Sequence, residues 1–440
     1  MSAAALSPAA YWRLVRSNRD FRLLWSAQIV SELGDWIYAV AIYALLLEAT
    51  GSARSVAIAV VLQVLPQVLV APVAGALNDR ISRKKIMISA DLARAAIVLV
   101  MLFASRAGCI RAIYCLLFLE TLMWAFFEPG RSATVPNIAG EGELVVANAL
   151  SSATWSTTLA LGSGLGGVAA AFAGRDAVFV LNSASFLLSA ALLSRMRLKE
   201  QHIRRTQPAA LRDLLLDLRP IAEGVRYIAR RQRLIPLIVV KAALGFLGVQ
   251  WVLMPIFGER VFPISSPGID PARGAMLAMS FLMSARGVGA LLGPLLSTQW
   301  TGERRRRLRL GIVIGFAMMA AGSCALAFAP NLGTAMATVV LANAGGSMVW
   351  VFATTLLQFY TSDEFRGRVF SLDFAFHVSA MAAASYTTGL AVDAGTGVRT
   401  IALLAGAAAA VACVWWLFVL RRWPRAAGAA PEAEQRAGSG

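Results

Sequence analysis

Residues Gly75 to Met87 read Gly-Ala-Leu-Asn-Asp-Arg-Ile-Ser-Arg-Lys-Lys-Ile-Met and stand between two long apolar runs. The preceding run, residues 56–76, contains no charged side chain, and residues 86–104 form the second run. About 20 mainly apolar helical residues suffice to cross the roughly 30 Å hydrocarbon layer of a bilayer. The stretch therefore indicates a short, strongly charged turn between two membrane-spanning helices.

The composition of the whole chain agrees with a membrane protein. Of its 440 residues, 58% are hydrophobic and 15% are charged, and the mean hydropathy is +0.66. Soluble domains contain about 45–50% apolar and about 25% charged residues. We therefore expect an integral membrane protein.

Twelve apolar runs are long enough to be spans, which predicts an all-α fold of twelve transmembrane helices in two pseudo-symmetric bundles of six. The expected spans are 23–47, 56–76, 86–104, 112–127, 149–173, 177–193, 235–257, 274–300, 310–329, 332–359, 369–392 and 400–420. The expected domains are a lead (1–22), a first bundle (23–194), a linker (195–234), a second bundle (235–421) and a disordered tail (422–440). Because the first run is too long for a signal peptide, it should remain as the first span.

The net charge of +17 orients the protein and does not indicate a nucleic-acid partner. With a cytoplasmic N-terminus, 31 of the 41 Lys and Arg residues fall in inner segments and only seven in outer loops. This asymmetry follows the positive-inside rule and places both termini in the cytoplasm. Nucleic-acid binding needs a basic soluble face, and no soluble domain is present.

Two landmarks of the first half recur in the second half at nearly one distance. Residues 33–36 (Leu-Gly-Asp-Trp) are echoed by 247–251 (Leu-Gly-Val-Gln-Trp), with 214 residues from Gly34 to Gly248. Gly75 is echoed by Gly293, 218 residues later. The pattern supports two related halves.

Residues 195–233 form the longest charged stretch, in the linker between the two bundles. Apolar residues recur there at spacings of three and four, beginning at Leu211, which is typical of an amphipathic helix on the membrane face. A solvated linker explains the basic residues equally well. Both interpretations stay open at this point.

Ionised side chains within apolar runs are the candidates for chemistry, because each costs at least about 2.5 kcal/mol at the bilayer centre. Asp35 lies near the middle of the first span, and Glu32 lies one turn earlier on the same face, so both could line one cavity. Glu120 shares a face of the fourth span with Trp124. We expect Asp35, with Glu32 and Glu120, to couple transport to protons, with a structural ion pair as the alternative for Asp35.

Further residues are expected to line a substrate cavity or to hold the halves together. The cavity candidates are Trp124, Phe127, Lys241, Gln250, Trp251, Arg286 and His377. For Lys241 and Arg286, a fixed ion pair is the favoured interpretation over an anion-binding role. Asp91 and Arg94 lie three residues apart beside the charged turn, which suggests a latch between helix ends.

The spacing of Gly75, Asp79, Arg80, Arg83 and Lys84 resembles the loop signature of the major facilitator superfamily, although Ser82 stands where that family usually has a second glycine. Residues 31–35, 129–136 and 363–369 resemble motifs of its enterobactin-exporter-like and drug-efflux branch. The resemblance implies a conformational gate formed by Gly75, Asp79, Arg80, Arg83, Lys84, Asp91, Arg94, Arg131, Arg366 and Arg368.

Residues 162–167, Gly-Ser-Gly-Leu-Gly-Gly, resemble the antiporter signature of the same superfamily, with Ser163 in the place of proline. The matching glycines are Gly162, Gly164, Gly166 and Gly167. The resemblance implies a proton-coupled antiporter of the bacterial inner membrane that exports a small amphipathic molecule such as a siderophore, antibiotic or other drug. The expected partners are this substrate and the lipid bilayer, and we expect a monomer.

No cofactor other than the proton gradient is expected. No phosphate-binding Gly-rich loop is present, and the four cysteines lack metal-ligand spacing, so neither ATP hydrolysis nor a metal site is predicted. A membrane enzyme would need a base or metal site, but His202 and His377 lack the spacing for one. A non-transporting sensor, a lysophospholipid flippase and a metabolite symporter of the same fold remain alternatives.

Overall fold

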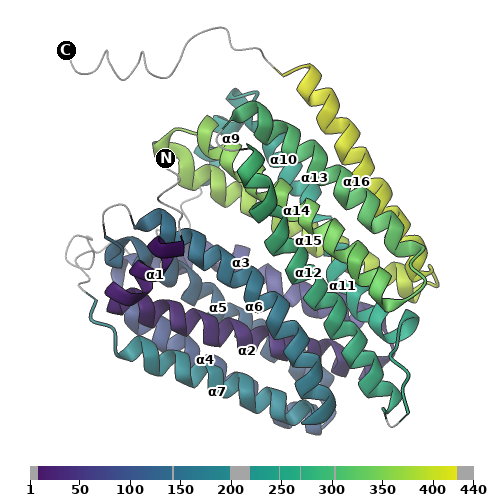
Figure 1. Cartoon of the computed structure of the whole chain (residues 1–440). Coiled ribbons are helices and arrows are strands. Elements are labelled where there is room, and N and C mark those ends of the chain that lie inside the picture. Colours follow the sequence, from purple (N-terminus) through teal and green to yellow (C-terminus); the bar gives the residue numbers. More distant parts are fainter. Residues whose placement is uncertain are drawn as a thin grey trace, which may run out of the picture.

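The computed structural model describes residues 8–140, 143–198, 219–246, 248–267, 269–301 and 304–423. Every regular element in these ranges is a helix (Figure 1). The first half contains α1 (Pro8–Ser17), α2 (Arg19–Thr50), α3 (Ala53–Arg80), α4 (Arg83–Arg106), α5 (Ile110–Ile138), α6 (Leu144–Phe172) and α7 (Arg175–Ser194). The second contains α9 (Arg219–Arg230), α10 (Leu234–Gly245), α11 (Gly248–Ile256), the π-helical turn η3 (Phe257–Val261), α12 (Pro271–Thr301), α13 (Arg305–Ala327), α14 (Leu332–Tyr360), α15 (Asp363–Asp393) and α16 (Val398–Arg421).

Within the described ranges, ten helical segments are long and apolar enough to cross a membrane, counting 234–261 as one. The helices α6 and α15 are similarly long and pack inside the same bundle, but they do not belong to those ten. α6 is rich in Ser, Thr and Gly, and α15 includes Asp373 and Asp393. An all-helical membrane fold is thus present, and the count of twelve spans stays a prediction.

The helices of each half pack mainly on one another. In the first half α2 lies against α6 and α7, while α4 lies against α5 and α7. In the second half α13 lies against α14 and α16, and α15 lies against α10 and α11. The two halves meet along two helix pairs, α6 with α12 and α3 with α15.

The expected seventh span, residues 235–257, is not one continuous helix. It is broken between α10 and α11 and finishes in the π-helical turn. A Cβ at Gly245 would lie 2.7 Å from the His377 carbonyl oxygen, and one at Gly248 would collide with the Met381 carbonyl, so both glycines permit close approach of α15. The helix breaks where it packs closely against α15, and hydropathy contains no information about this packing.

The lead and the linker are partly helical. The N-terminal lead forms α1 from Pro8 onward, and Asn18 caps α2 by accepting a hydrogen bond from the Phe21 amide at 2.9 Å. In the linker, α9 packs on α15, where Glu223 pairs with Arg368 at 3.0 Å. Leu211 and the rest of 199–218 lie outside the described residues, as does the tail from residue 424 onward.

The two ends of the bundle differ in how the halves are joined. We call the end with α1, α9 and the Arg80–Arg83 turn the basic end, and the other the opposite end. Buried apolar residues of both halves form a single cluster at the opposite end, from Tyr38 to Leu47 of α2 through to Val252 and Met276. At the basic end, each half has its own cluster. The halves are therefore packed together at the opposite end and have separate cores at the basic end.

Candidate functional site

The most highly charged buried site lies within the first half, around Arg94 of α4. Its guanidinium contacts Asp35 of α2 at 2.7 Å and Glu120 of α5 at 2.6 Å. Asp91, one turn earlier on α4, lies 3.8 Å away. Three helices thus converge on a single cation, and we call these four residues the Arg94 cluster.

The surroundings of the cluster are closed on nearly all sides. Phe186 of α7 lies 4.0 Å from the guanidinium, and Ser189 donates a hydrogen bond to Asp91 at 2.6 Å. The side chains of Arg94, Asp91 and Glu120 are at most 9% exposed, whereas that of Asp35 is 27% exposed. Asp35 is therefore the member of the cluster that water reaches most readily.

Glu32 and Asp35 take part in different hydrogen-bond networks. Glu32 accepts hydrogen bonds from Gln28 at 2.8 Å and from Thr158 of α6 at 3.0 Å. Gln28 in turn accepts from Arg131, which forms a bidentate pair with Glu128. Arg131, a predicted gate residue, ties α5 to α2 within the first half.

Lys241 and Asp373 form the buried ion pair of the second half. Their charged atoms are 2.6 Å apart, and both side chains are almost fully buried. The ammonium lies 3.8 Å from the ring centroid of Trp350, and His377 contacts the Lys241 carbonyl at 2.9 Å. The expected ion pair of Lys241 is present.

Arg286 of α12 lies in an aromatic stack between the two halves. Its guanidinium carbon is 3.4 Å from the Trp251 ring centroid. Trp251 is stacked on Trp36 of α2 with centroids 5.7 Å apart and an interplanar angle of 12°, and Trp36 meets Trp155 edge to face at 5.8 Å. Among the described residues, the carboxylate expected to pair with Arg286 is absent.

The remaining cavity candidates are mostly packing residues. Phe127 is 4% exposed and belongs to the core of the first half at the basic end. Gln250 is buried and accepts a hydrogen bond from Asn343 at 2.8 Å. Trp124 is half-buried on α5. Neighbouring residues therefore cover Phe127 and Gln250, two of the cavity candidates.

The charged turn is attached to its own half. Arg83 donates to the Ala133 carbonyl of α5 at 2.8 Å, and Lys84 donates to the Ser194 carbonyl after α7 at 2.6 Å. Ser82 caps α4 by accepting from the Lys85 amide at 3.2 Å, so a serine is useful where the family signature has glycine.

Gly75 of the loop signature has open space around it in the described part of the chain, since a Cβ there would meet nothing within 4 Å. The side chain of Asp79 lies outside the described residues. Arg80 ends α3, and Arg366 lies in the first turn of α15 beside Arg368. The turn and the start of α15 are both at the basic end.

The glycine motif of α6 lies where the halves meet. A Cβ at Gly162 would lie 2.6 Å from that of Trp36, and one at Gly166 would lie 2.6 Å from the Ile37 carbonyl oxygen, both on α2. On another face, a Cβ at Gly167 would collide with Ser280 of α12, and Gly164 faces the same helix. Small residues therefore let α6 lie close to both α2 and α12.

Sequence reasoning missed a contact that joins the halves at the opposite end. Asp393, just past the expected span 369–392, accepts hydrogen bonds from the Ser52 hydroxyl and from the amides of Ala53 (2.8 Å) and Arg54 (3.2 Å). It thereby caps the N-terminus of α3. Burial opposes ionisation, but these hydrogen bonds lower the pKa of Asp393 below its ordinary value. Only its position at a helix end hinted at this role.

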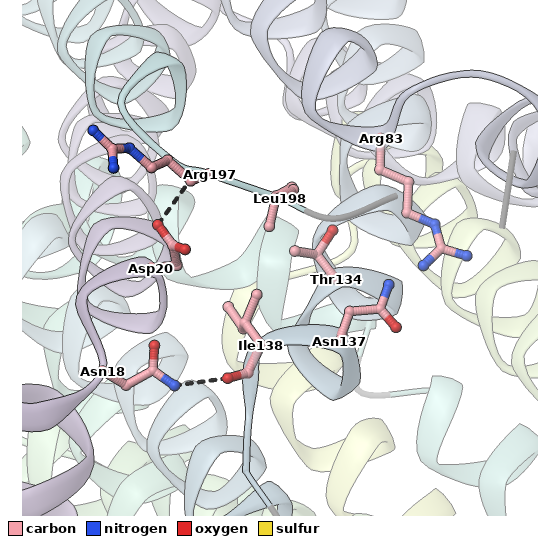
Figure 2. A pocket seen from close by; sticks show the side chains of 8 residues that line it. All are labelled: Asn18, Asp20, Arg83, Thr134, Asn137, Ile138, Arg197 and Leu198. Carbon is pink, nitrogen blue, oxygen red and sulfur yellow. Dashed lines mark hydrogen bonds between the residues drawn. The ribbon is translucent and has the colours of Figure 1, made fainter. Parts of the chain in front are cut away.

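A polar cavity of about 220 Å³ opens at the basic end, away from the charged clusters (Figure 2). Asn18 reaches across it to the Ile138 carbonyl at 2.7 Å, and the Arg197 amide donates to Asp20 at 3.1 Å. The first contact attaches the residue before α2 to the end of α5, and the second attaches the chain after α7 to the first turn of α2. The cavity lies within the first half, so it does not separate the two halves.

Comparison with known proteins identifies the family. The family model described as "transmembrane secretion effector" matches residues 12–436, nearly the whole chain. The chain belongs to this family. The transmembrane secretion effectors and the relatives named below are transporters, not enzymes.

Curated relatives of this chain include transporters whose names state a cargo. Macrolide efflux protein A of Streptococcus pyogenes is 26% identical over 367 residues, which cover 82% of this chain and 85% of the relative. The putative bacilysin exporter BacE of Bacillus subtilis is 22% identical and is covered to 71%, with 68% of this chain aligned. The uncharacterized MFS-type transporter YkuC of Bacillus subtilis is 26% identical, and the alignment spans 64% of each protein.

Solved structures of other transporters have the same overall fold as this chain. A POT family transporter in complex with 5-aminolevulinic acid superposes with a TM-score of 0.71 at 12% identity, covering 93% of this chain and 97% of that one. The nucleoside transporter NupG superposes with a TM-score of 0.64 at 10% identity, covering 90% and 99%. At such low identity the likeness concerns the fold alone.

Proposed function

We propose that this secretion effector is a proton-coupled antiporter that exports a small amphipathic molecule by alternating access. Two halves that meet along α6 with α12 and α3 with α15 can rock about a central site. The positive-inside rule assigns the basic end to the cytoplasm of a bacterial inner membrane. With a joint core at the opposite end, the structure then corresponds to a state that is closed to the outside.

The observation that carries the proton coupling is the Arg94 cluster. Three carboxylates share one guanidinium, so the ionised cluster carries excess negative charge away from bulk water. Like charges in a poorly solvated site favour uptake of a proton by one of them. Asp35 is the most exposed of the three and comes from a helix that touches the second half, so it is the member we propose to load and release the proton.

Proton binding to Asp35 would change the packing between helices as well as the charge. A neutral Asp35 holds Arg94 less strongly, while Glu120 and Asp91 still compensate the guanidinium. The contact between α2 and α4 is weakened, and α2 also packs on α6 with Gly162 and Gly166 between them. Protonation of Asp35 is thereby linked to α6, which lies at the interface between the two halves.

The proposed cargo follows from the aromatic lining and from the relatives. Trp36 and Trp155 of the first half and Trp251 of the second offer flat apolar surfaces where the two halves meet. A macrolide efflux protein and a putative bacilysin exporter are among the relatives, and the motifs resemble siderophore exporters. Siderophores, antibiotics and other drugs are therefore the proposed cargo classes, with a lysophospholipid or a co-transported metabolite as the alternative.

Inside-out membrane vesicles test the proposal. Respiration acidifies their lumen, so an antiporter that exports from cells should drive a fluorescent amphipathic dye into the lumen, and an uncoupler should release it. Asp35→Asn should abolish this accumulation with unchanged membrane insertion. Glu48→Gln is the matched control, because Glu48 lies on the same helix but pairs with Arg175 at the surface. Accumulation by Asp35→Asn equal to wild type would exclude Asp35 from coupling.

A further inference from the structure

Arg94, Lys241 and Arg286 lie within apolar runs of the sequence, and they differ in how their charge is compensated. Arg94 is surrounded by three carboxylates and Lys241 is paired with Asp373. Arg286 makes no ion pair and no hydrogen bond to any residue that the structure describes. Its contact is the face of Trp251 at 3.4 Å. Arg286 therefore stands out as a cation without a protein counter-ion.

An uncompensated guanidinium at this depth requires an explanation. Arginine keeps its charge in proteins, so it cannot become neutral as a buried lysine can. Ionisable residues within membrane spans face cavities or partners and mark the path of a substrate or ion. The ring of Trp251 supplies a modest cation–π attraction, which orients the guanidinium but does not neutralise it.

The position of Arg286 suits a ligand that enters between the halves. The next residue, Gly287, is in close contact with Ala160 of α6, so Arg286 lies on the helix pair that joins the halves. Its side chain and those of Trp36 and Trp251 are only partly buried. Trp36 directly follows Asp35 on α2, so the stack and the Arg94 cluster share this helix.

We propose that Arg286 binds the anionic group of the transported molecule, and that the indole stack of Trp251 and Trp36 contacts its apolar part. The cargo class is thus an amphipathic organic anion, such as a carboxylate, whose two oxygens match the planar guanidinium fork. The inference rests on the proposed transport function and narrows its substrate. The proton site lies in the first half, whereas the cation of the proposed anion site is on α12 of the second half.

Binding is measured separately from transport. The probe is carboxyfluorescein, an anionic xanthene dye, titrated into the purified full chain in phosphatidylcholine nanodiscs and followed by fluorescence polarisation. Rhodamine 123, a cationic xanthene dye, is the matched probe. Arg286→Gln should weaken binding of the anionic dye by about tenfold or more, because loss of the charge leaves the anion unpaired. It should leave binding of the cationic dye unweakened, and Arg286→Lys should retain part of the affinity for the anion.

The outcomes separate the inference from the function on which it rests. Equal binding of carboxyfluorescein by the wild type and Arg286→Gln, or no binding by the wild type, overturns the anion site. If the wild type binds carboxyfluorescein more tightly than Arg286→Gln does, but vesicles show no uncoupler-sensitive uptake, the anion site is upheld and proton-driven export is refuted. Uptake of rhodamine 123 by both forms, with no carboxyfluorescein binding, upholds export and refutes the anion site. Monodisperse elution of Arg286→Gln and Arg286→Lys shows that both variants are folded.

The source of the anion is resolved by competition. Displacement of carboxyfluorescein by lysophosphatidylglycerol at lower concentrations than by benzoate supports the site with a lipid headgroup as its ligand. The reverse order supports the site with a soluble organic anion. In both cases the Arg286→Gln variant should show no charge-dependent competition, and competition that is unchanged in this variant contradicts the assignment to Arg286.

Discussion

The cap that Asp393 places on α3 should hold the opposite end closed. Asp393→Ala removes the acceptor of three hydrogen bonds that cross between the halves, from Ser52, Ala53 and Arg54. Loss of an N-cap side chain costs about 0.5–2 kcal/mol. Because Arg54 is exposed and Ser52 is only partly buried, water can replace part of the loss, and about 1 kcal/mol is the reasonable expectation.

This free energy acts only on the state in which the cap is formed. A penalty of 1–2 kcal/mol changes a two-state equilibrium by a factor of about 5–30, so the lower value should raise the population open at the opposite end by about fivefold. The carboxylate is the form that accepts all three hydrogen bonds, and its pKa is lowered in the capped state. The stabilisation is therefore present above the ordinary pKa of 3.8 and is lost as the pH falls through the lowered value.

Distances between spin labels report the equilibrium directly. In a background without the four natural cysteines, labels at Ala107→Cys and Thr400→Cys lie on the two halves at the opposite end, and pulsed electron resonance gives their distance distribution in nanodiscs. The long-distance fraction should rise in Asp393→Ala. The control Asp176→Asn removes an exposed acid that pairs with Arg106 inside one half and should leave the distribution unchanged. Identical distributions for wild type and Asp393→Ala would refute the reasoning.

Two further predictions concern buried packing and charge. Lys241→Ala should lower the free energy of unfolding by about 3–5 kcal/mol, because it leaves Asp373 charged without its partner. The double variant Lys241→Met with Asp373→Leu should recover most of this loss in a thermal denaturation assay. If the single and the double variant are equally destabilised, this explanation is wrong. Gly167→Val should reduce uncoupler-sensitive dye accumulation several-fold, because its Cβ would collide with Ser280 of α12; wild-type transport by this variant would show that α6 and α12 separate without difficulty.

Much of the helical architecture is readable from local composition. Apolar runs give helix positions because the bilayer requires every backbone polar group to be bonded within its own segment. The break after Gly245 escaped this reasoning, since hydropathy is high on both sides of it. The packing of α9 on α15 was also missed, because an amphipathic pattern identifies an apolar face but not the surface that covers it.

For the candidate site, the sequence alone determined which residues are unusual, because a charge within an apolar run is costly wherever the chain folds. Asp35, Glu120, Arg94 and Arg286 could all be named on that basis. Only the tertiary structure decided that Arg94 gathers three carboxylates from three helices while Arg286 meets an indole ring and no described carboxylate. Residues far apart in the chain become neighbours through helix packing, and periodicity within one helix carries no information about which partner the neighbouring helix presents.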